Sequence, residues 1–259
     1  MASPSPTLTL GIVQFDIVWE DPGANMNRIE RLLGDKTSFD LLLLPEMWST
    51  GFSMQPEKVA EENNGPALQW MREQAKKRNT CIGGSISISE NQNYFNRWYC
   101  VYPDGHTEQY DKKHLFSYGK ENEHYTPGNK TMVFQINGWR IMPIICYDLR
   151  FPAWCRNREN YDLLLVAANW PSPRIHHWDA MLKARSIENQ SYVAAVNRIG
   201  SDATGLHYNG HSQVLDMNGQ ELLYSSLDEG VESITLDKDS LSKYRIQYPF
   251  LRDMDQYSL

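Results

Sequence analysis

The chain has 259 residues and a formal net charge of −7, and its lysine and arginine residues are scattered rather than clustered. This distribution excludes a surface built to bind nucleic acid, which needs a concentrated basic patch. The length suffices for one large α/β domain with an ample core, and we expect residues 1–259 to form a single domain.

Membrane and metal partners are also not expected. Residues 1–6 carry no basic segment before a long apolar core, and no later apolar run is long enough to cross a bilayer. Cys81, Cys100, Cys146 and Cys155 include neither a C-x-x-C pair nor a His-x-x-x-His partner, so the pattern predicts neither a zinc site nor a disulfide framework. We therefore expect free, reduced thiols in a soluble, cytoplasmic protein.

The first third of the chain alternates strands and helices. Residues 8–15 predict a strand, and residues 25–33 place their apolar side chains on one helical face. Residues 40–46 contain a continuous apolar run, typical of a strand covered on both sides, with Glu46 at its carboxyl end. A second helix over residues 65–79 is followed by a strand over residues 81–88.

Two hairpins and a long loop follow. Strands over residues 94–102 and 107–114 flank the turn Pro-Asp-Gly, and residues 117–130 form an irregular polar stretch whose length suggests a functional loop. Strands over residues 131–136 and 140–145 flank a second turn, Asn-Gly. This second hairpin ends at Cys146.

The strand and helix alternation then resumes. The remaining segments predict strands and helices with no internal repeat or linker. They are a helix over 153–160, a strand over 162–168, a helix over 176–190, strands over 192–196, 212–216, 222–224 and 232–236, and a helix from residue 239.

Cys146 lies where a buried strand gives way to a helix-like segment opened by Pro152. A thiol at such a junction is near backbone N–H groups and the positive end of a helix dipole, and both favour the thiolate. Taken alone, the residue is more often an inert apolar filler, because unpaired cysteine is among the most buried residue types.

Three segments place titratable groups at strand ends or in adjoining loops: residues 44–47 (Leu-Pro-Glu-Met), 110–116 (Tyr-Asp-Lys-Lys-His-Leu-Phe) and 146–152 (Cys-Tyr-Asp-Leu-Arg-Phe-Pro). A thiol nucleophile needs a base, and a carbonyl under attack needs a positive group where negative charge develops. Glu46 could instead be a solvated carboxylate. Lys112 and Lys113 would point to opposite faces of a strand, so at most one of them serves a site.

Together these segments resemble the nitrilase superfamily of carbon-nitrogen hydrolases, and most closely its omega-amidase-like branch. The resemblance runs from residue 8 to about residue 244. Further segments that carry it are Glu121 ahead of Tyr-Thr-Pro-Gly (125–128), Ala-Ala-Asn-Trp-Pro (167–171), His-Trp (177–178) and Ala-Arg-Ser-Ile-Glu-Asn (184–189).

The resemblance implies roles for four side chains and needs no metal or organic cofactor. Cys146 would be the nucleophile, Glu46 the general base and Lys112 the cation over the intermediate, with the backbone N–H of Tyr147 as a second donor. Glu121 matches a second family glutamate that positions substrate and assists proton transfer, although Glu123 lies in the same loop.

The resemblance also implies a fold and an assembly. The family fold is a four-layer α-β-β-α sandwich of the α/β class, in which two subunits join to extend the stack into a homodimer or higher homo-oligomer. Trp154, Trp178 and Met181 are then candidates for the dimer contact. The alternative is that these side chains are buried within one subunit.

The implied substrates are small monoamides of dicarboxylic acids, such as 2-oxoglutaramate and 2-oxosuccinamate. The far carboxylate needs a cation, for which Arg150 and Arg174 are candidates, although Arg150 could instead pair with Asp148. Candidates for the walls of the site, which could also be ordinary core aromatics, are Trp48, Phe52, Tyr118 and Trp170.

Two other functions stay open on the sequence. A nitrilase or carbamoyl hydrolase of the same superfamily would share the catalytic groups, although Tyr147-Asp148 after the cysteine, in place of Trp-Glu, favours an amidase over a nitrilase. A binding protein regulated through Cys146 could keep the fold without catalysis. The presence of all four catalytic residue types favours the enzyme.

Overall fold

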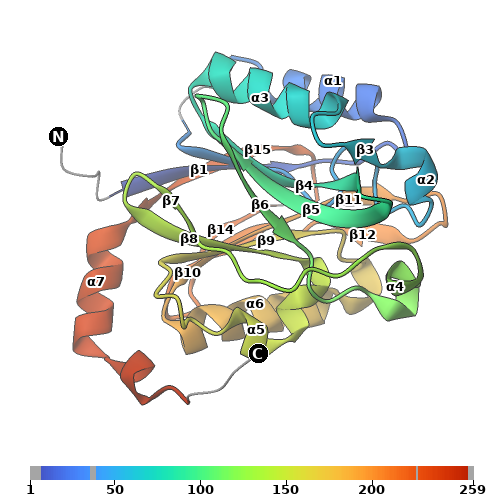
Figure 1. Cartoon of the computed structure of the whole chain (residues 1–259). Coiled ribbons are helices and arrows are strands. Elements are labelled where there is room, and N and C mark those ends of the chain that lie inside the picture. Colours follow the sequence, from blue (N-terminus) through green and yellow to red (C-terminus); the bar gives the residue numbers. More distant parts are fainter. Residues whose placement is uncertain (1–6, 36–38, 226, 256–259) are drawn as a thin grey trace.

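The structure is a computed structural model that describes residues 7–35, 39–225 and 227–255. Residues 1–6, which enter the prediction that the chain has no leader segment, lie outside this description. Two sheets stack face to face in the middle of the molecule, and helices cover their outer faces (Figure 1).

The first sheet has parallel strands at its centre. β1 and β2 run parallel, as do β2 and β4, whereas β15, β5 and β6 pair antiparallel with their neighbours. The order across the sheet is β15 (Gly230–Asp237), β1 (Thr7–Gln14), β2 (Leu41–Leu43), β4 (Cys81–Glu90), β5 (Asn93–Val101) and β6 (Thr107–Asp111), with β3 (Glu61–Glu62) beside β4.

The second sheet repeats this plan with a parallel centre of β8, β9 and β10. The order is β14 (Glu221–Tyr224), β13 (Gln213–Leu215), β10 (Tyr192–Asn197), β9 (Leu163–Ala168), β8 (Trp139–Ile145) and β7 (Phe134–Ile136). A separate hairpin of β11 (Ile199–Ser201) and β12 (His207–Asn209) projects from the end of β10. In each sheet the carboxyl ends of the parallel strands are where loops can form a site.

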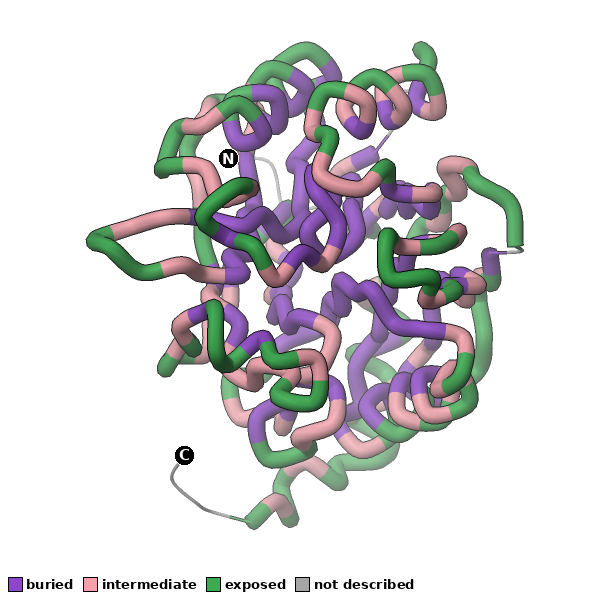
Figure 2. Tube along the Cα trace, turned by 90° about the vertical axis from the view of Figure 1, so that its right-hand side faces the viewer, coloured by how far each residue is buried: buried purple, intermediate pink, exposed green. Residues whose placement is uncertain are grey.

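Alternation along the strands divides the core into layers. On β1, Leu10 belongs to the core shared by the two sheets, whereas Val13 belongs to the core under the outer helices. On β2, Leu43 and Leu42 divide in the same way. This is the double-sided burial that the apolar run over residues 40–46 predicts. Figure 2 shows buried chain along the sheets and exposed chain on the outer helix faces.

Helices complete the stack. α1 (Pro22–Leu33) and α3 (Pro66–Arg78) cover the first sheet, and α5 (Pro152–Cys155) and α6 (Ile175–Asn189) cover the second (Figure 1). The predicted four-layer α-β-β-α sandwich is therefore confirmed. The remaining helical segments are α2 (Pro56–Val59), α4 (Glu121–His124), α7 (Lys238–Gln247) and the 3₁₀ turns Ser117–Gly119, Cys146–Arg150, Ser172–Arg174 and Phe250–Asp253.

The predicted helix over residues 153–160 is wrong in extent. A 3₁₀ turn takes up Cys146–Arg150, and α5 ends at Cys155 because Arg156 adopts extended backbone angles. The strand predicted over residues 107–114 ends at Asp111, so Lys112 and Lys113 lie beyond it.

Trp154 and Trp178, predicted as candidates for a dimer contact, are buried within the subunit. The indole N–H of Trp154 donates to the Tyr110 hydroxyl at 2.9 Å, and that of Trp178 donates to the His211 carbonyl at 2.9 Å. Met181 is partly exposed on α6. Across the described ranges, the helices are too short or too polar to span a membrane.

Candidate active site

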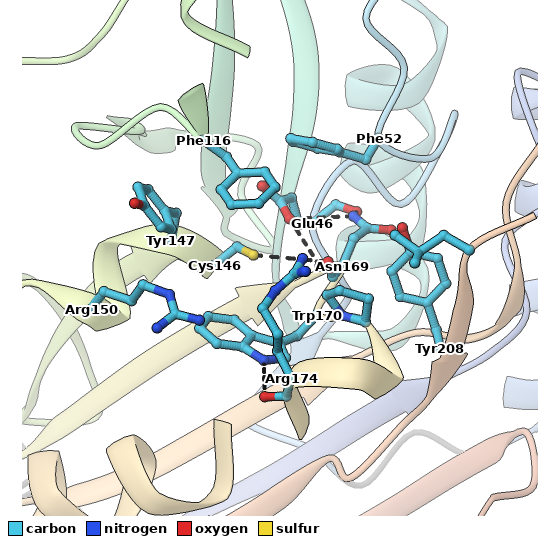
Figure 3. A pocket seen from close by; sticks show the side chains of 12 residues that line it. Glu46, Phe52, Phe116, Cys146, Tyr147, Arg150, Asn169, Trp170, Arg174 and Tyr208 are labelled. Carbon is cyan, nitrogen blue, oxygen red and sulfur yellow. Dashed lines mark hydrogen bonds between the residues drawn. The ribbon is translucent and has the colours of Figure 1, made fainter. Parts of the chain in front are cut away.

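Cys146 stands at the carboxyl end of β8 in an uncommon backbone conformation. Its φ is 43°, in the left-handed region that residues other than glycine rarely adopt. Cys146 also begins the 3₁₀ turn Cys146–Arg150. Such a position persists only when its surroundings hold it. The turn directs the sulfur toward the space between the two sheets, where the Asn169 carbonyl lies 4.0 Å from Sγ (Figure 3).

Glu46 follows β2 of the other sheet and is completely buried. Its Oε1 accepts hydrogen bonds from Lys112 Nζ at 2.8 Å and Asn96 Nδ2 at 2.9 Å, and its Oε2 accepts one from the backbone N–H of Asn169 at 2.9 Å. Because Asn169 follows β9, these bonds join the carboxyl ends of strands from both sheets. Glu46 is therefore a fixed carboxylate rather than a solvated one.

Lys112 is held between two carboxylates. Its Nζ donates to Glu46 at 2.8 Å and to both oxygens of Glu121 at 2.9 and 3.1 Å, and its side chain is fully buried. Glu121 also accepts the Phe116 backbone N–H at 2.6 Å and Asn96 Nδ2 at 3.1 Å. Lys113 points elsewhere, with its Nζ 5.6 Å from the centre of the Trp154 ring.

Burial and charge pull the pKa values of this group in opposite directions. Burial raises the pKa of the Glu121 carboxyl, and the adjacent Lys112 partly offsets that rise. Burial lowers the pKa of Lys112, but the carboxylates of Glu121 and Glu46 outweigh this effect. The net result is a pKa well above the usual range of a lysine, so the ammonium stays charged. The site thus holds a permanent cation inside the protein.

The Cys146 thiol is neutral at rest. Burial first, and then the negative charge of Glu46, raise its pKa well above the usual range, although Lys112 acts in the opposite direction. Burial and the Glu46 charge therefore outweigh the backbone N–H groups and the helix dipole that the sequence predicts to favour the thiolate. The segment after it is a short 3₁₀ turn, whose dipole is small beside a buried carboxylate.

A cavity of about 50 Å³ opens onto the sulfur (Figure 3). Its walls are formed by the predicted catalytic residues Glu46 and Cys146, by aromatic rings and by two guanidinium groups. The lining residues are Glu46, Phe52, Phe116, Cys146, Tyr147, Arg150, Asn169, Trp170, Pro171, Arg174, Leu206 and Tyr208. Of the residues predicted to bind substrate or to form the walls of the site, this set includes Phe52, Tyr147, Arg150, Trp170 and Arg174.

Two arginine side chains line the cavity. The Arg150 guanidinium lies 4.8 Å from the centre of the Trp170 ring, and that of Arg174 lies 5.4 Å from the Phe116 ring. Arg150 also donates to His177 Nδ1 at 3.1 Å. Burial, His176 and the two arginines lower the pKa of His177, so the imidazole is neutral and accepts this bond.

One prediction about a site residue, Tyr118, needs correction, and the structure selects between the alternatives left open for Trp48 and Arg150. The Tyr118 side chain is 85% exposed and lies outside the cavity lining, because the 3₁₀ turn Ser117–Gly119 turns it outward. Trp48 is a core residue packed on Trp70, with ring centres 4.9 Å apart. Asp148 pairs with His114 and Tyr110, which leaves Arg150 to the cavity.

Sequence reasoning missed Asn96 and Asn169. Asn96 lies within β5 and Asn169 follows β9, and both donate hydrogen bonds to Glu46. The signal for Asn96 is an uncharged polar residue inside a strand pattern, and the signal for Asn169 is its place in the Ala-Ala-Asn-Trp-Pro segment, to which no role was assigned. In the described part of the chain, no group of three His, Cys, Asp or Glu side chains is arranged to hold a metal ion.

Comparisons with known proteins show the family of the chain. The chain is 39% identical to omega-amidase YafV of Escherichia coli over 98% of its own length and 99% of that protein. It is 32% identical to 2-oxoglutaramate amidase of Bacillus subtilis, over 95% of this chain and 97% of that one.

Solved structures give the same result. The carbon-nitrogen hydrolase superfamily protein XC1258 of Xanthomonas campestris, solved with an arsenic adduct in its active site, superimposes with a TM-score of 0.95 at 38% identity, covering 98% of this chain and 99% of that one. Residues 9–246 match the model of the carbon-nitrogen hydrolase family. The chain therefore belongs to the carbon-nitrogen hydrolases and is an amidohydrolase that acts on carbon–nitrogen bonds.

Proposed function

We propose that this enzyme is an omega-amidase, which hydrolyses the terminal amide of small dicarboxylic acid monoamides such as 2-oxoglutaramate and 2-oxosuccinamate. The observation that carries the proposal is a cavity in which the Cys146 thiol, the Glu46 carboxylate and two arginines face one small space. The curated relatives named omega-amidase and 2-oxoglutaramate amidase, similar over nearly the whole chain, support it.

In the first half-reaction, Glu46 removes the proton from the Cys146 thiol as the sulfur attacks the amide carbonyl. Because the thiol is neutral at rest, a base adjacent to it is required. Lys112 and the backbone N–H of Tyr147, in the first turn of the 3₁₀ segment, stabilise the oxyanion of the tetrahedral intermediate. The C–N bond then breaks, and ammonia leaves with the proton from Glu46.

In the second half-reaction, the thioester on Cys146 is hydrolysed. Glu46 removes a proton from water, the hydroxide attacks the thioester carbonyl, and the C–S bond breaks to release the free acid. The sulfur recovers its proton from Glu46. Glu121 holds Lys112 in place throughout, as its two hydrogen bonds to Nζ support.

The arginines give the proposal its substrate class. A guanidinium binds a carboxylate by paired, charge-assisted hydrogen bonds, and Arg150 and Arg174 have no carboxylate partner among the described ion pairs. Their guanidinium groups are instead positioned over aromatic rings at the cavity. The end of the substrate opposite to the amide is therefore an anion.

Ammonia release from matched compounds tests the proposal. We expect 2-oxoglutaramate to be hydrolysed with a far higher kcat/KM than a neutral amide of the same length, and Arg174→Met to raise KM for the carboxylate substrate about 10- to 100-fold. The kcat/KM for the neutral amide should change little in this variant. Equal kcat/KM values for charged and neutral amides would remove the omega-amidase assignment.

Two controls address the chemistry. Cys146→Ala should abolish ammonia release, and unchanged release would show that another nucleophile acts. Turnover of a nitrile or a carbamoyl compound in place of amides would assign the enzyme to another branch of the superfamily. Loss of turnover for every compound would favour a binding protein.

We further propose that residues 1–259 form one domain, that the enzyme is a homodimer, and that it works in the cytoplasm. The shared core between the two sheets supports a single domain. The four free cysteines and the need for a reduced Cys146 favour a reducing compartment. Sedimentation of the purified protein tests the dimer.

A further inference from the structure

Asp148 lies two residues after Cys146 and is fully buried. Its Oδ2 accepts the Tyr110 hydroxyl at 2.7 Å and the Ile145 backbone N–H at 3.1 Å. Its Oδ1 accepts the backbone N–H of His114 at 2.9 Å and contacts His114 Nδ1 at 2.8 Å. One carboxylate thus joins the turn that carries Cys146 to the segment that carries Lys112.

The partners of Asp148 bracket the two functional side chains in sequence. Tyr110 and His114 lie two residues before and two residues after Lys112, and Ile145 immediately precedes Cys146. Lys112 lies one residue beyond the end of β6, where its backbone N–H still donates to the Asn96 carbonyl of β5 at 3.0 Å, and Cys146 lies one residue beyond the end of β8. The bonds to Asp148 connect these two segments, which come from different sheets.

The surroundings of Asp148 are themselves rigid. The Tyr110 hydroxyl accepts the Trp154 indole N–H at 2.9 Å, and the His114 ring stacks on Phe151 with centres 3.7 Å apart and planes 8° apart. Burial, and then the Asp148 charge, raise the pKa of Tyr110 well above its usual range, so the phenol keeps the proton that it donates. A carboxylate bonded to several donors is stable in the interior without a lysine or arginine.

We propose that Asp148 is a positioning residue that fixes the Cys146 sulfur relative to the Lys112 ammonium. The strained backbone at Cys146, with φ at 43°, needs such support, since it persists only where neighbouring structure holds it. The inference rests on the proposed function for the roles of these two side chains. A displacement of about 1 Å between reacting groups costs about 100-fold in rate.

The main test is Asp148→Asn, with kcat and KM measured for 2-oxoglutaramate and the rate of Cys146 alkylation by iodoacetamide measured at constant pH. We expect kcat to fall about 100-fold while KM stays within about threefold. Alkylation should slow about tenfold. Loss of the Asp148 charge would by itself favour the thiolate and speed alkylation, so a slower reaction reports lost positioning.

Asp162→Asn is the matched control. Asp162 is also buried and joins distant segments, with Oδ2 bonded to the Arg140 backbone N–H at 2.9 Å and to Lys238 Nζ at 2.7 Å, but these bonds do not involve the segments that carry Lys112 and Cys146. This variant should lower Tm and leave kcat and alkylation unchanged. If Asp148→Asn behaves in the same way, Asp148 only stabilises the fold and the proposal is overturned.

A milder pair covers the case in which Asp148→Asn does not fold. Tyr110→Phe removes one bond to Asp148 and should lower kcat about tenfold at unchanged KM, whereas Tyr161→Phe, which removes a buried bond of 2.6 Å to the Cys155 carbonyl, should not. Equal kcat values for the two variants would contradict the proposal. If the wild type hydrolyses no monoamide, the proposed function fails, and the alkylation rates alone decide about Asp148.

Discussion

The position of the Lys112 ammonium is fixed by its surroundings. Its ammonium is completely buried and bonded to Glu46 and Glu121, so it cannot move to solvent as a surface lysine does. Lys113, its neighbour, contacts the Trp154 ring and is partly exposed. The two adjacent lysines therefore form a natural pair of test and control.

We expect Lys112→Ala to lower kcat about 100- to 1,000-fold, the usual effect of removing one donor to an oxyanion. Lys113→Ala should change kcat less than about threefold, because its Nζ lies over the Trp154 ring and not between Glu46 and Glu121. Ammonia release at saturating substrate measures both, with circular dichroism to show that each variant is folded. A larger loss of kcat in Lys113→Ala than in Lys112→Ala would assign the role of the oxyanion donor to Lys113.

The pKa of Cys146 gives a second prediction at this scale. The negative charge of Glu46 raises this pKa, so Glu46→Gln should lower it, and the positive charge of Lys112 opposes the rise, so Lys112→Met should raise it further. The rate of iodoacetamide alkylation against pH reports the midpoint. It should move down in the first variant and up in the second, while both lose ammonia release. Unchanged midpoints in both variants would mean that burial alone sets the pKa.

At the scale of elements, strand ends could be predicted and loop geometry could not. The apolar runs before Glu46 and Cys146 are local signals, and β2 and β8 form where they predict. The segment 146–155 has no such pattern of apolar residues. Its backbone is irregular, since Cys146 adopts a left-handed φ and begins a 3₁₀ turn. The direction of Tyr118 depends on a similar turn, and for that reason its predicted place in the site was wrong.

Helix α3 illustrates a cap that sequence patterns do not indicate. Gly65 precedes the helix and makes no side-chain cap, and the Glu61 carboxylate instead accepts the backbone N–H groups of Ala67 at 2.9 Å and Leu68 at 3.0 Å. We expect Glu61→Ala to destabilise the protein by about 1 kcal/mol, as loss of an N-cap does. Glu62→Ala is the control, since Glu62 is exposed. Urea unfolding that fails to separate the two variants would exclude the capping role.

At the scale of the whole molecule, the site belongs to neither sheet alone. Glu46 and Lys112 follow strands of the first sheet, whereas Cys146 and Asn169 follow strands of the second. The bond of 2.9 Å between the Asn169 N–H and Glu46 Oε2 joins residues 123 positions apart. No local pattern encodes such a contact, so the sequence indicated the chemical groups through resemblance to a family and left Asn96 and Asn169 unassigned.

Because one core cluster includes side chains of both sheets, we expect the sandwich to unfold as a single cooperative unit. Leu10 on β1 and Leu165 on β9 are both buried in this cluster, at 0% and 1% exposure. Leu10→Ala and Leu165→Ala should each cost about 3 kcal/mol and shift the same calorimetric transition by about 10 °C. Two separate transitions, with each variant moving only one, would divide the chain into two domains and place the site at their interface.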